Sequence, residues 1–288
     1  MEGFDLDPGL ARAVCDRLGV GVPASLADVD RLYRAWTGAV PFDPVAKVAA
    51  IAEGRTPPGD DPADLCRRWL ATGLGATCWG HCTALAGIVG LGGARCTVGL
   101  DRMRTEAKVD FHSFTVVHDG DRRLALDPVH PSGSPLLLQD GSRGDHGVYR
   151  VGIDERDRRL EHWFWHPAVT ADRIAYVVLS VDLDRADVRA FCAVSSRFSG
   201  VRGGRLHVRR CPPGRIVALR VGEDGVARLV DRAADGTTAE TATDDVGEAL
   251  ALAGFHGDAV DLVERSGLVR RDGAGHLRFP IAPSADPT

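Results

Sequence analysis

The sequence predicts an α+β protein made of three consecutive parts. Apolar side chains recur at helical spacing in residues 1–95 and are interspersed with polar ones, as in β-strands, in residues 96–199. These patterns predict a helical bundle followed by a small β-barrel. A glycine-rich stretch at residues 200–204 then opens a third, mixed α/β part over residues 200–288. With 288 residues, 44% of them hydrophobic, the chain can hold one large domain or two to three small domains with packed cores.

Capping residues mark the helices of the first part. A helix with one apolar face is expected from Leu10 to Leu18 and ends before Gly19. Ser25 and Asp28 have the spacing of a capping box ahead of a second helix. Asp61-Pro62 supplies an N-cap and a first-turn proline for a third.

The other two parts are expected to be richer in strands. In the central part we expect strands at residues 96–100, 111–118, 122–126 and 174–181, with a further short strand considered at 148–151. In the third part we expect strands at 206–209, 215–220 and 226–230, and helices at 246–252 and 259–266. The tail after residue 280 is expected to fray.

The hairpin in the central part places a histidine beside an aspartate. Asp119-Gly120 separates two extended runs, and Asp-Gly is a strong signal for a two-residue turn. With that turn His112 lies opposite Asp127, with Cβ atoms about 4.5 to 5.5 Å apart on one face of the sheet. An aspartate in this position can hold one tautomer of the histidine and stabilise its imidazolium. An ordinary ion pair on a solvated face would give the same pattern.

Cys78 is the candidate nucleophile. Leu85, Ile88 and Val89 recur at helical spacing after it and glycines precede it, so a helix should begin close to Cys78. The unpaired N–H groups and the dipole at a helix start favour a thiolate, and the backbone N–H groups of Cys78 and Trp79 could hold an oxyanion. A buried and inert cysteine is the alternative.

A zinc site is a further alternative for this cluster. Cys78, His81 and Cys82 lie within about one helical turn, and His112 could complete four ligands. No second clustered pair of ligands follows, and Cys78 would then lack its base. We therefore assign no metal.

These residues resemble the arylamine N-acetyltransferases, which belong to the wider transglutaminase-like cysteine superfamily. Beyond Cys78, His112 and Asp127, the similar segments are Val40-Pro41-Phe42-Asp43, Ser134-Pro135-Leu136-Leu137, Tyr149-Arg150, Trp163-Phe164-Trp165 and Ser195-Ser196-Arg197-Phe198. The resemblance covers nearly the whole chain at low identity, as expected of a divergent member. It implies a papain/transglutaminase-like core and a third domain that forms a lid over the cysteine.

The resemblance also implies an activity. An acyl group would pass from acetyl-CoA, another acyl-CoA or an acyl carrier protein through acyl-Cys78 to a small-molecule amine in a ping-pong reaction. The product would be an amide, with natural-product biosynthesis as one setting and no permanently bound cofactor. Candidates for the substrate pocket are Phe42, Trp79, Phe111 and His130. His130 is otherwise expected, like His146, to be an exposed loop histidine.

The departures from the family keep two other functions open. The family has Arg-Gly-Gly before its cysteine and Phe-Glu after it, whereas this chain has Gly75-Ala76-Thr77 before Cys78 and Trp79-Gly80-His81 after it. The family's asparagine after Pro-Phe-Glu is Pro44 here. Because Cys-Trp-Gly-His is closer to the general transglutaminase-like pattern, amide hydrolysis or exchange is the second hypothesis. A non-catalytic binding module that kept the fold is the third.

Composition narrows the partners and the compartment. A net charge of −5, a pI near 6.1 and basic residues that cluster only in pairs argue against nucleic-acid binding. The sequence has no run of 18 apolar residues, which argues against a membrane span. Seven cysteines at irregular spacing, without a secretion signal, predict reduced thiols in the cytoplasm.

Overall fold

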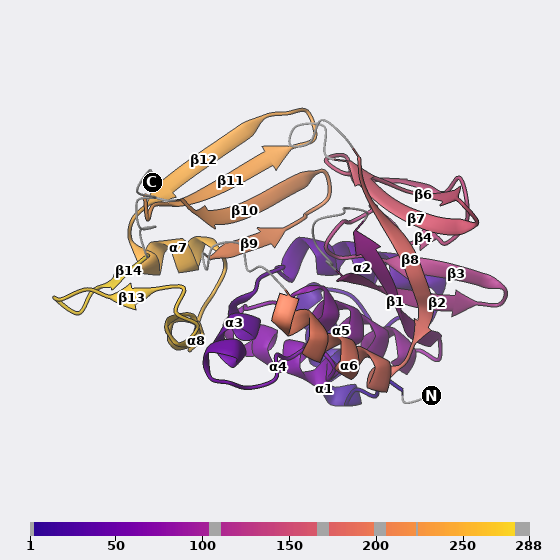
Figure 1. Ribbon diagram of the computed structural model, residues 1–288, viewed down its shortest axis with the longest axis horizontal. Coiled ribbons are helices and arrows are strands. Elements are labelled where there is room, and N and C mark those ends of the chain that lie inside the picture. The colour runs from indigo at the N-terminus through magenta and orange to yellow at the C-terminus, as the bar shows by residue number, and fades with distance from the viewer. Residues whose placement is uncertain (1–2, 104–110, 166–172, 199–205, 223, 280–288) are drawn as a thin grey trace.

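A computed structural model describes residues 3–103, 111–165, 173–198, 206–222 and 224–279. It has an α+β architecture (Figure 1): helices at the N-terminal end, a curled antiparallel sheet beside them and a smaller sheet with its own helices above. The predicted fold class is confirmed. The predicted boundaries after residues 95 and 199 stay predictions, and residues 199–205, which hold the glycine-rich connection, lie outside the described residues, as does the tail from residue 280.

Five helices make up the N-terminal part: α1 (Pro8–Leu18), α2 (Leu26–Ala39), α3 (Val45–Ala52), α4 (Pro62–Thr72) and α5 (Cys78–Leu91). The predicted caps are in place, because Ser25 accepts a hydrogen bond from the Asp28 amide and Asp61 accepts one from the Ala63 amide. Helix α5 is buried along most of its length. Helix α3 was not predicted.

The large sheet has eight antiparallel strands in the order β4-β3-β2-β1-β8-β7-β6-β5, and it curls into a barrel-like shape. Its strands are β1 (Arg95–Met103), β2 (Phe111–Asp119), β3 (Arg122–Leu126), β4 (Leu136–Leu137), β5 (Arg143–Asp145), β6 (Arg150–Arg156), β7 (Arg159–Trp165) and β8 (Ile174–Leu183). Strand β2 also packs against α5. This contact brings the histidine strand to the cysteine helix.

The predicted register of the β2–β3 hairpin is wrong by two residues. Asp119 pairs with Arg122, so the turn is Gly120-Asp121, with positive φ at Gly120. Strand β3 ends at Leu126, opposite Thr115, and His112 is therefore not directly opposite Asp127. Side chains alternate faces with a period of two, so a two-residue shift keeps both residues on one face as diagonal neighbours.

Helix α6 (Arg185–Phe198) follows β8 and was not predicted. Its Val188 and Cys192 are buried in one cluster with Trp79 and Cys82 of α5. Residues 195–198, cited above for the resemblance, form its last turn. The helix packs against α5 and β8 and lies in front of α5 in Figure 1.

The third part is a four-stranded antiparallel sheet with two helices and a small hairpin. Its elements are β9 (His207–Arg210), β10 (Arg215–Val221), β11 (Ala227–Ala233), β12 (Thr238–Thr243), α7 (Val246–Leu252), α8 (Ala259–Arg265), β13 (Arg270–Arg271) and β14 (Leu277–Arg278). Its core includes Val45 of α3 and Leu74, and Phe42 bridges to Arg209. Among the described residues, no helix combines the length and apolar character that a membrane span requires.

Candidate active site

Cys78 is the first residue of α5 and is partly exposed. The N-cap is Thr77, whose side chain makes no capping hydrogen bond, so the first-turn amides of Cys78 and Trp79 are not capped by it. The helix begins where the sequence predicted, and its dipole favours negative charge at this end.

A tight backbone contact holds the loop that precedes Cys78. Phe42 bridges to Ala76, and the buried carboxylate of Asp43 accepts hydrogen bonds from the amides of Val45 and Gly75. A Cβ atom at Gly75 would lie 1.6 Å from the carbonyl oxygen of Pro41, so only glycine fits there. Burial raises the pKa of Asp43 to about 6. The segment that carried part of the family resemblance thus positions the cysteine loop.

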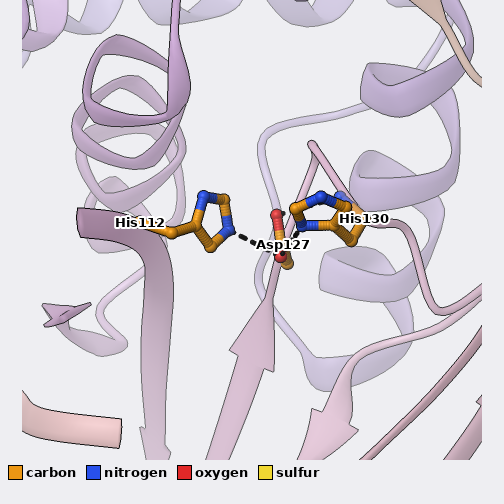
Figure 2. A group of neighbouring side chains, drawn as sticks. All are labelled: His112, Asp127 and His130. Atoms are coloured by element: carbon orange, nitrogen blue, oxygen red, sulfur yellow. Dashed lines mark hydrogen bonds and ion pairs between the residues drawn. The ribbon is translucent and has the colours of Figure 1, made fainter. Parts of the chain in front are cut away.

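Strand β2 and the loop after β3 bring His112 to Asp127. Nε2 of His112 lies 2.8 Å from Oδ2 of Asp127, and both side chains are buried. Figure 2 shows the carboxylate of Asp127 between the rings of His112 and His130. Oδ1 of Asp127 accepts from the amides of Val129 and His130, at 2.9 and 3.1 Å, and its carbonyl oxygen accepts from the hydroxyl of Tyr33.

Cys78, His112 and Asp127 shift one another's pKa values in the directions that favour a thiolate beside an imidazolium. Burial alone would raise the pKa of Cys78, but a hydrogen bond with His112, its positive charge, a hydrogen bond with Ser113 and the charge of Lys47 lower it below the ordinary value. Burial alone would lower the pKa of His112, but the charges of two aspartates, together with hydrogen bonds, hold it well above its ordinary value.

Asp127 is the anion of this group. Burial would raise the pKa of Asp127, but His112 and His130 hold it well below its ordinary range through their charge and their hydrogen bonds. The arrangement can therefore support a thiolate on Cys78 beside an imidazolium on His112, with a carboxylate behind it.

His130 is not an exposed loop histidine, and that expectation was wrong. It is buried, its Nδ1 lies 3.2 Å from Oδ2 of Asp127, and its ring stacks on Phe164. His146 is buried as well, with its Nε2 3.1 Å from the carbonyl oxygen of Cys211. Neither burial could be predicted locally, because the contacting residues are distant in sequence.

The other pocket candidates lie in two places. Trp79 is buried and stacks on Phe191 of α6, and the partly buried Phe111 packs edge-on against the same ring. Phe42 is also partly buried, with the guanidinium of Arg209 over its ring. Trp79 and Phe111 therefore share one wall with α6, whereas Phe42 lies where β9 meets the cysteine loop.

His81 and Cys82 are buried in the packed interior of the molecule. Nδ1 of His81 accepts a hydrogen bond from Nε1 of Trp36, and its Nε2 donates to the carbonyl oxygen of Pro41. Burial lowers the pKa of His81 to about 4. Both ring nitrogens are thus occupied, and the four-ligand set weighed for zinc is not assembled.

A different group, His112, Asp127 and His130, has donor types that also bind metals, with atoms within 4.8 Å of one another. Oδ2 of Asp127 already accepts from both rings, and we describe the group as a hydrogen-bonded His–Asp–His chain.

Sequence reasoning missed four buried neighbours of the site. Ser113 contacts both Cys78 and Cys82, and Lys47 adds positive charge from α3. Asp101 pairs with His112 across β1 and β2, and its Oδ2 lies 3.3 Å from Nδ1 of His162. The proximity of Ser113 to His112 in sequence was one usable signal, whereas the positions of the others depend on tertiary contacts.

Comparison with solved structures identifies the fold. The arylamine N-acetyltransferase of M. tuberculosis matches with a TM-score of 0.68 at 14% identity, over 91% of this chain and 100% of that one. The M. smegmatis enzyme matches with a TM-score of 0.69 at 16% identity, over 91% and 97%. The Mycobacterium marinum enzyme in complex with CoA matches with a TM-score of 0.68 at 16% identity, over 89% and 96%.

The sequence comparisons give no closer relative. No family model matches the chain. No curated protein matches it either. The recognition made from the sequence is confirmed at the level of structure: this chain has the fold of the arylamine N-acetyltransferases, at 13–18% identity to the solved structures it matches.

Proposed function

We propose that the chain is a cysteine N-acyltransferase that moves an acyl group from a thioester donor through acyl-Cys78 to an amine. The observation that carries the proposal is the hydrogen-bonded series from Cys78 through His112 to Asp127, at the start of a buried helix. The fold shared with N-acetyltransferases supports the reaction class.

The first half-reaction acylates the enzyme. The thiolate of Cys78 attacks the carbonyl carbon of the donor thioester while the amides of Cys78 and Trp79 hold the oxyanion. The intermediate collapses by breaking the carbon–sulfur bond of the donor, and the donor thiolate takes the proton from His112. Attack by one thiolate on another thiol's ester is nearly balanced in energy, so the covalent intermediate is accessible.

The second half-reaction forms the amide. The amine attacks the carbonyl carbon of acyl-Cys78, and neutral His112 accepts the proton that the amine loses. The bond to Cys78 breaks, and the cysteine leaves as the thiolate beside the imidazolium. Asp127 keeps the histidine in one orientation and tautomer throughout.

We propose acyl-CoA as the donor class, with an acyl carrier protein as the alternative. A solved neighbour is described as a complex with CoA, which favours acyl-CoA. All seven cysteines are free thiols, in keeping with a reducing compartment such as the cytoplasm. A role in natural-product biosynthesis stays a prediction.

The amide-hydrolysis hypothesis loses its sequence argument. It rested on Trp79 and His81 in the Cys-Trp-Gly-His segment. In the structure Trp79 packs on α6 and His81 ties α5 to α2, so both residues have structural roles that fit either reaction.

Mass spectrometry of the intact protein tests the proposal. The protein is incubated with a panel of acyl-CoAs and acyl carrier proteins beside a Cys78→Ala variant. We expect a mass gain of one acyl group that the variant lacks and that an added amine removes as amide. A donor that is cleaved without any adduct on Cys78, or the absence of reaction with every donor, would contradict acyl transfer.

A further inference from the structure

Two histidines share one oxygen of Asp127. Nε2 of His112 approaches Oδ2 at 2.8 Å and Nδ1 of His130 approaches the same atom at 3.2 Å (Figure 2). A carboxylate only accepts, so each ring must present an N–H to it. The proton on neutral His130 therefore sits on Nδ1. The proposed mechanism uses His112 and leaves His130 without a role.

His130 is held in place from several directions. Its ring lies parallel to that of Phe164, with centroids 3.7 Å apart and planes 13° from parallel. Its backbone amide donates to Oδ1 of Asp127. Arg209 donates to the carbonyl oxygen of Val129, which fixes the preceding residue of the loop. So held, the ring can keep its Nδ1 directed at one oxygen.

His130 stays neutral while His112 takes the charge. Burial, with the nearby charges of His112 and Arg209, lowers the pKa of His130 to about 3 despite its contact with Asp127. The charged and titratable groups around the two rings come from α5, five strands and the loop: Cys78 and Cys82 on α5, Asp101 on β1, His112 on β2, Asp127 in the loop, His162 on β7, Tyr176 on β8 and Arg209 on β9, with Tyr149 just before β6. Of the two rings, it is His112 that contacts the thiolate of Cys78.

We propose that His130 is a positioning residue for the triad: its neutral ring donates from Nδ1 to Oδ2 of Asp127, which fixes that oxygen against His112 and limits how tightly the carboxylate holds the His112 proton. The inference rests on the proposed function of Cys78, His112 and Asp127. It adds that His130 adjusts the pKa of His112 for the second half-reaction.

The pKa of His112 needs this adjustment because acylation removes the negative charge of Cys78. Once Cys78 is acylated, no thiolate is left to hold the proton of His112, and Asp127 becomes its one remaining hydrogen-bond partner among the described residues and, with Asp101, raises its pKa against burial. A base must be neutral to accept the proton of the amine, so too strong a pull from Asp127 would keep His112 protonated. A second N–H donor on Oδ2 weakens that pull.

Two substitutions separate the hydrogen bond from the packing. His130→Phe keeps a ring against Phe164 and removes the N–H donor. His130→Asn removes the ring but keeps a donor, because the side-chain nitrogen of asparagine is as many bonds from Cβ as Nδ1 of histidine. A purely structural role would be kept by phenylalanine and lost with asparagine. A positioning role gives the opposite result.

The measurement is the pKa of His112, by NMR titration of the full chain in a Cys78→Ala background, which mimics the loss of the thiolate. We expect His130→Phe to raise the pKa of His112 by about one unit and His130→Asn to leave it near the parent value. An unchanged pKa in His130→Phe, or an equal rise in both variants, would overturn the proposal.

A second measurement needs no change at His130. The ¹⁵N shifts of the parent protein should show His130 neutral, with its proton on Nδ1, at pH 5 and above. A proton on Nε2 instead would remove the donor and overturn the proposal even if both variants failed to fold. Neither experiment uses substrate, so a failure of the acyl-transfer proposal is detected separately by mass spectrometry.

Discussion

Two successive turns of α5 each carry a cysteine, and their environments differ sharply. Cys78 in the first turn is partly exposed, and its pKa is lowered because the hydrogen bond and charge of His112, together with Ser113 and Lys47, outweigh burial. Cys82 in the next turn is fully buried, and burial raises its pKa well above the ordinary value although His112 and Ser113 lie near it as well. The comparison teaches that being near a histidine is not enough. A direct hydrogen bond at the helix start separates a candidate nucleophile from an inert thiol.

Replacing each cysteine by serine gives the largest contrast. Cys78→Ser should lower the rate of acyl transfer by about 10⁴-fold or more, because a serine hydroxyl at this position stays protonated. Cys82→Ser is the matched control one turn away and should still acquire the acyl group. The rate of amide formation checks both. Comparable losses in the two variants would mean that the cysteines are not distinct in function.

Asp127→Asn tests whether the carboxylate gives His112 the charge that Cys78 depends on. An amide cannot stabilise the imidazolium and can present an N–H to Nε2, which would favour the wrong tautomer. Transfer should fall by about 10²- to 10⁴-fold. The thermal unfolding midpoint identifies any loss that comes from unfolding. Transfer within threefold of the parent rate would show that Asp127 does not orient the base.

Gly75→Ala tests the loop that precedes Cys78 and positions it in the first turn of α5. The new Cβ would overlap the carbonyl oxygen of Pro41, so we expect a loss of about 3 kcal/mol or more in the free energy of unfolding. Gly90→Ala, within α5, is the control, since its Cβ would meet nothing within 4 Å. That change should stabilise slightly. Chemical denaturation measures both, and equal effects would show that the loop contact is unimportant.

The pH dependence of alkylation tests the thiolate itself. The pKa of Cys78 is lowered and that of His112 is raised, and both shifts favour the thiolate–imidazolium pair. At pH 6 iodoacetamide should modify Cys78 about tenfold faster than an ordinary thiol or more. The rate should fall as the pH drops through the pKa of Cys78. Peptide mapping should show Cys82 unmodified in the folded protein. A Cys78 rate that only begins to rise near pH 8.5 would contradict the ion pair.

Local sequence signals were sufficient for the start of α5 but only partly for the hairpin. Glycines before Cys78 and apolar spacing after it located the helix start. The turn could be built on Asp119-Gly120 or on Gly120-Asp121, because either pair offers glycine for a positive φ. The choice moved the register by two residues, and the face shared by His112 and Asp127 survived because side chains alternate with a period of two.

Tertiary contacts decided what the sequence could not predict. Helix α3 is short and apolar on nearly every side, so it has no periodic polar face to reveal it. The burial of His130 depends on Phe164 of β7, while its loop is held by Arg209 of β9. Neither neighbour is close in sequence. A histidine in a loop rich in proline and serine looks exposed until the strands that cover it are placed.

Cys82→Ser has the smallest expected effect and tests how the Ser113 hydroxyl serves the two cysteines. The sulfur of Cys82 accepts a hydrogen bond from Ser113 at 3.6 Å, and a serine hydroxyl could replace it with little loss of volume. Burying the more polar hydroxyl should cost about 1 to 2 kcal/mol in the free energy of unfolding, measured with urea. The transfer rate should stay within about twofold, since Ser113 can still donate to Cys78. A tenfold loss of rate without further loss of stability would instead show that the Ser113 hydroxyl is shared between the two sulfurs and that Cys82 directs it toward the thiolate.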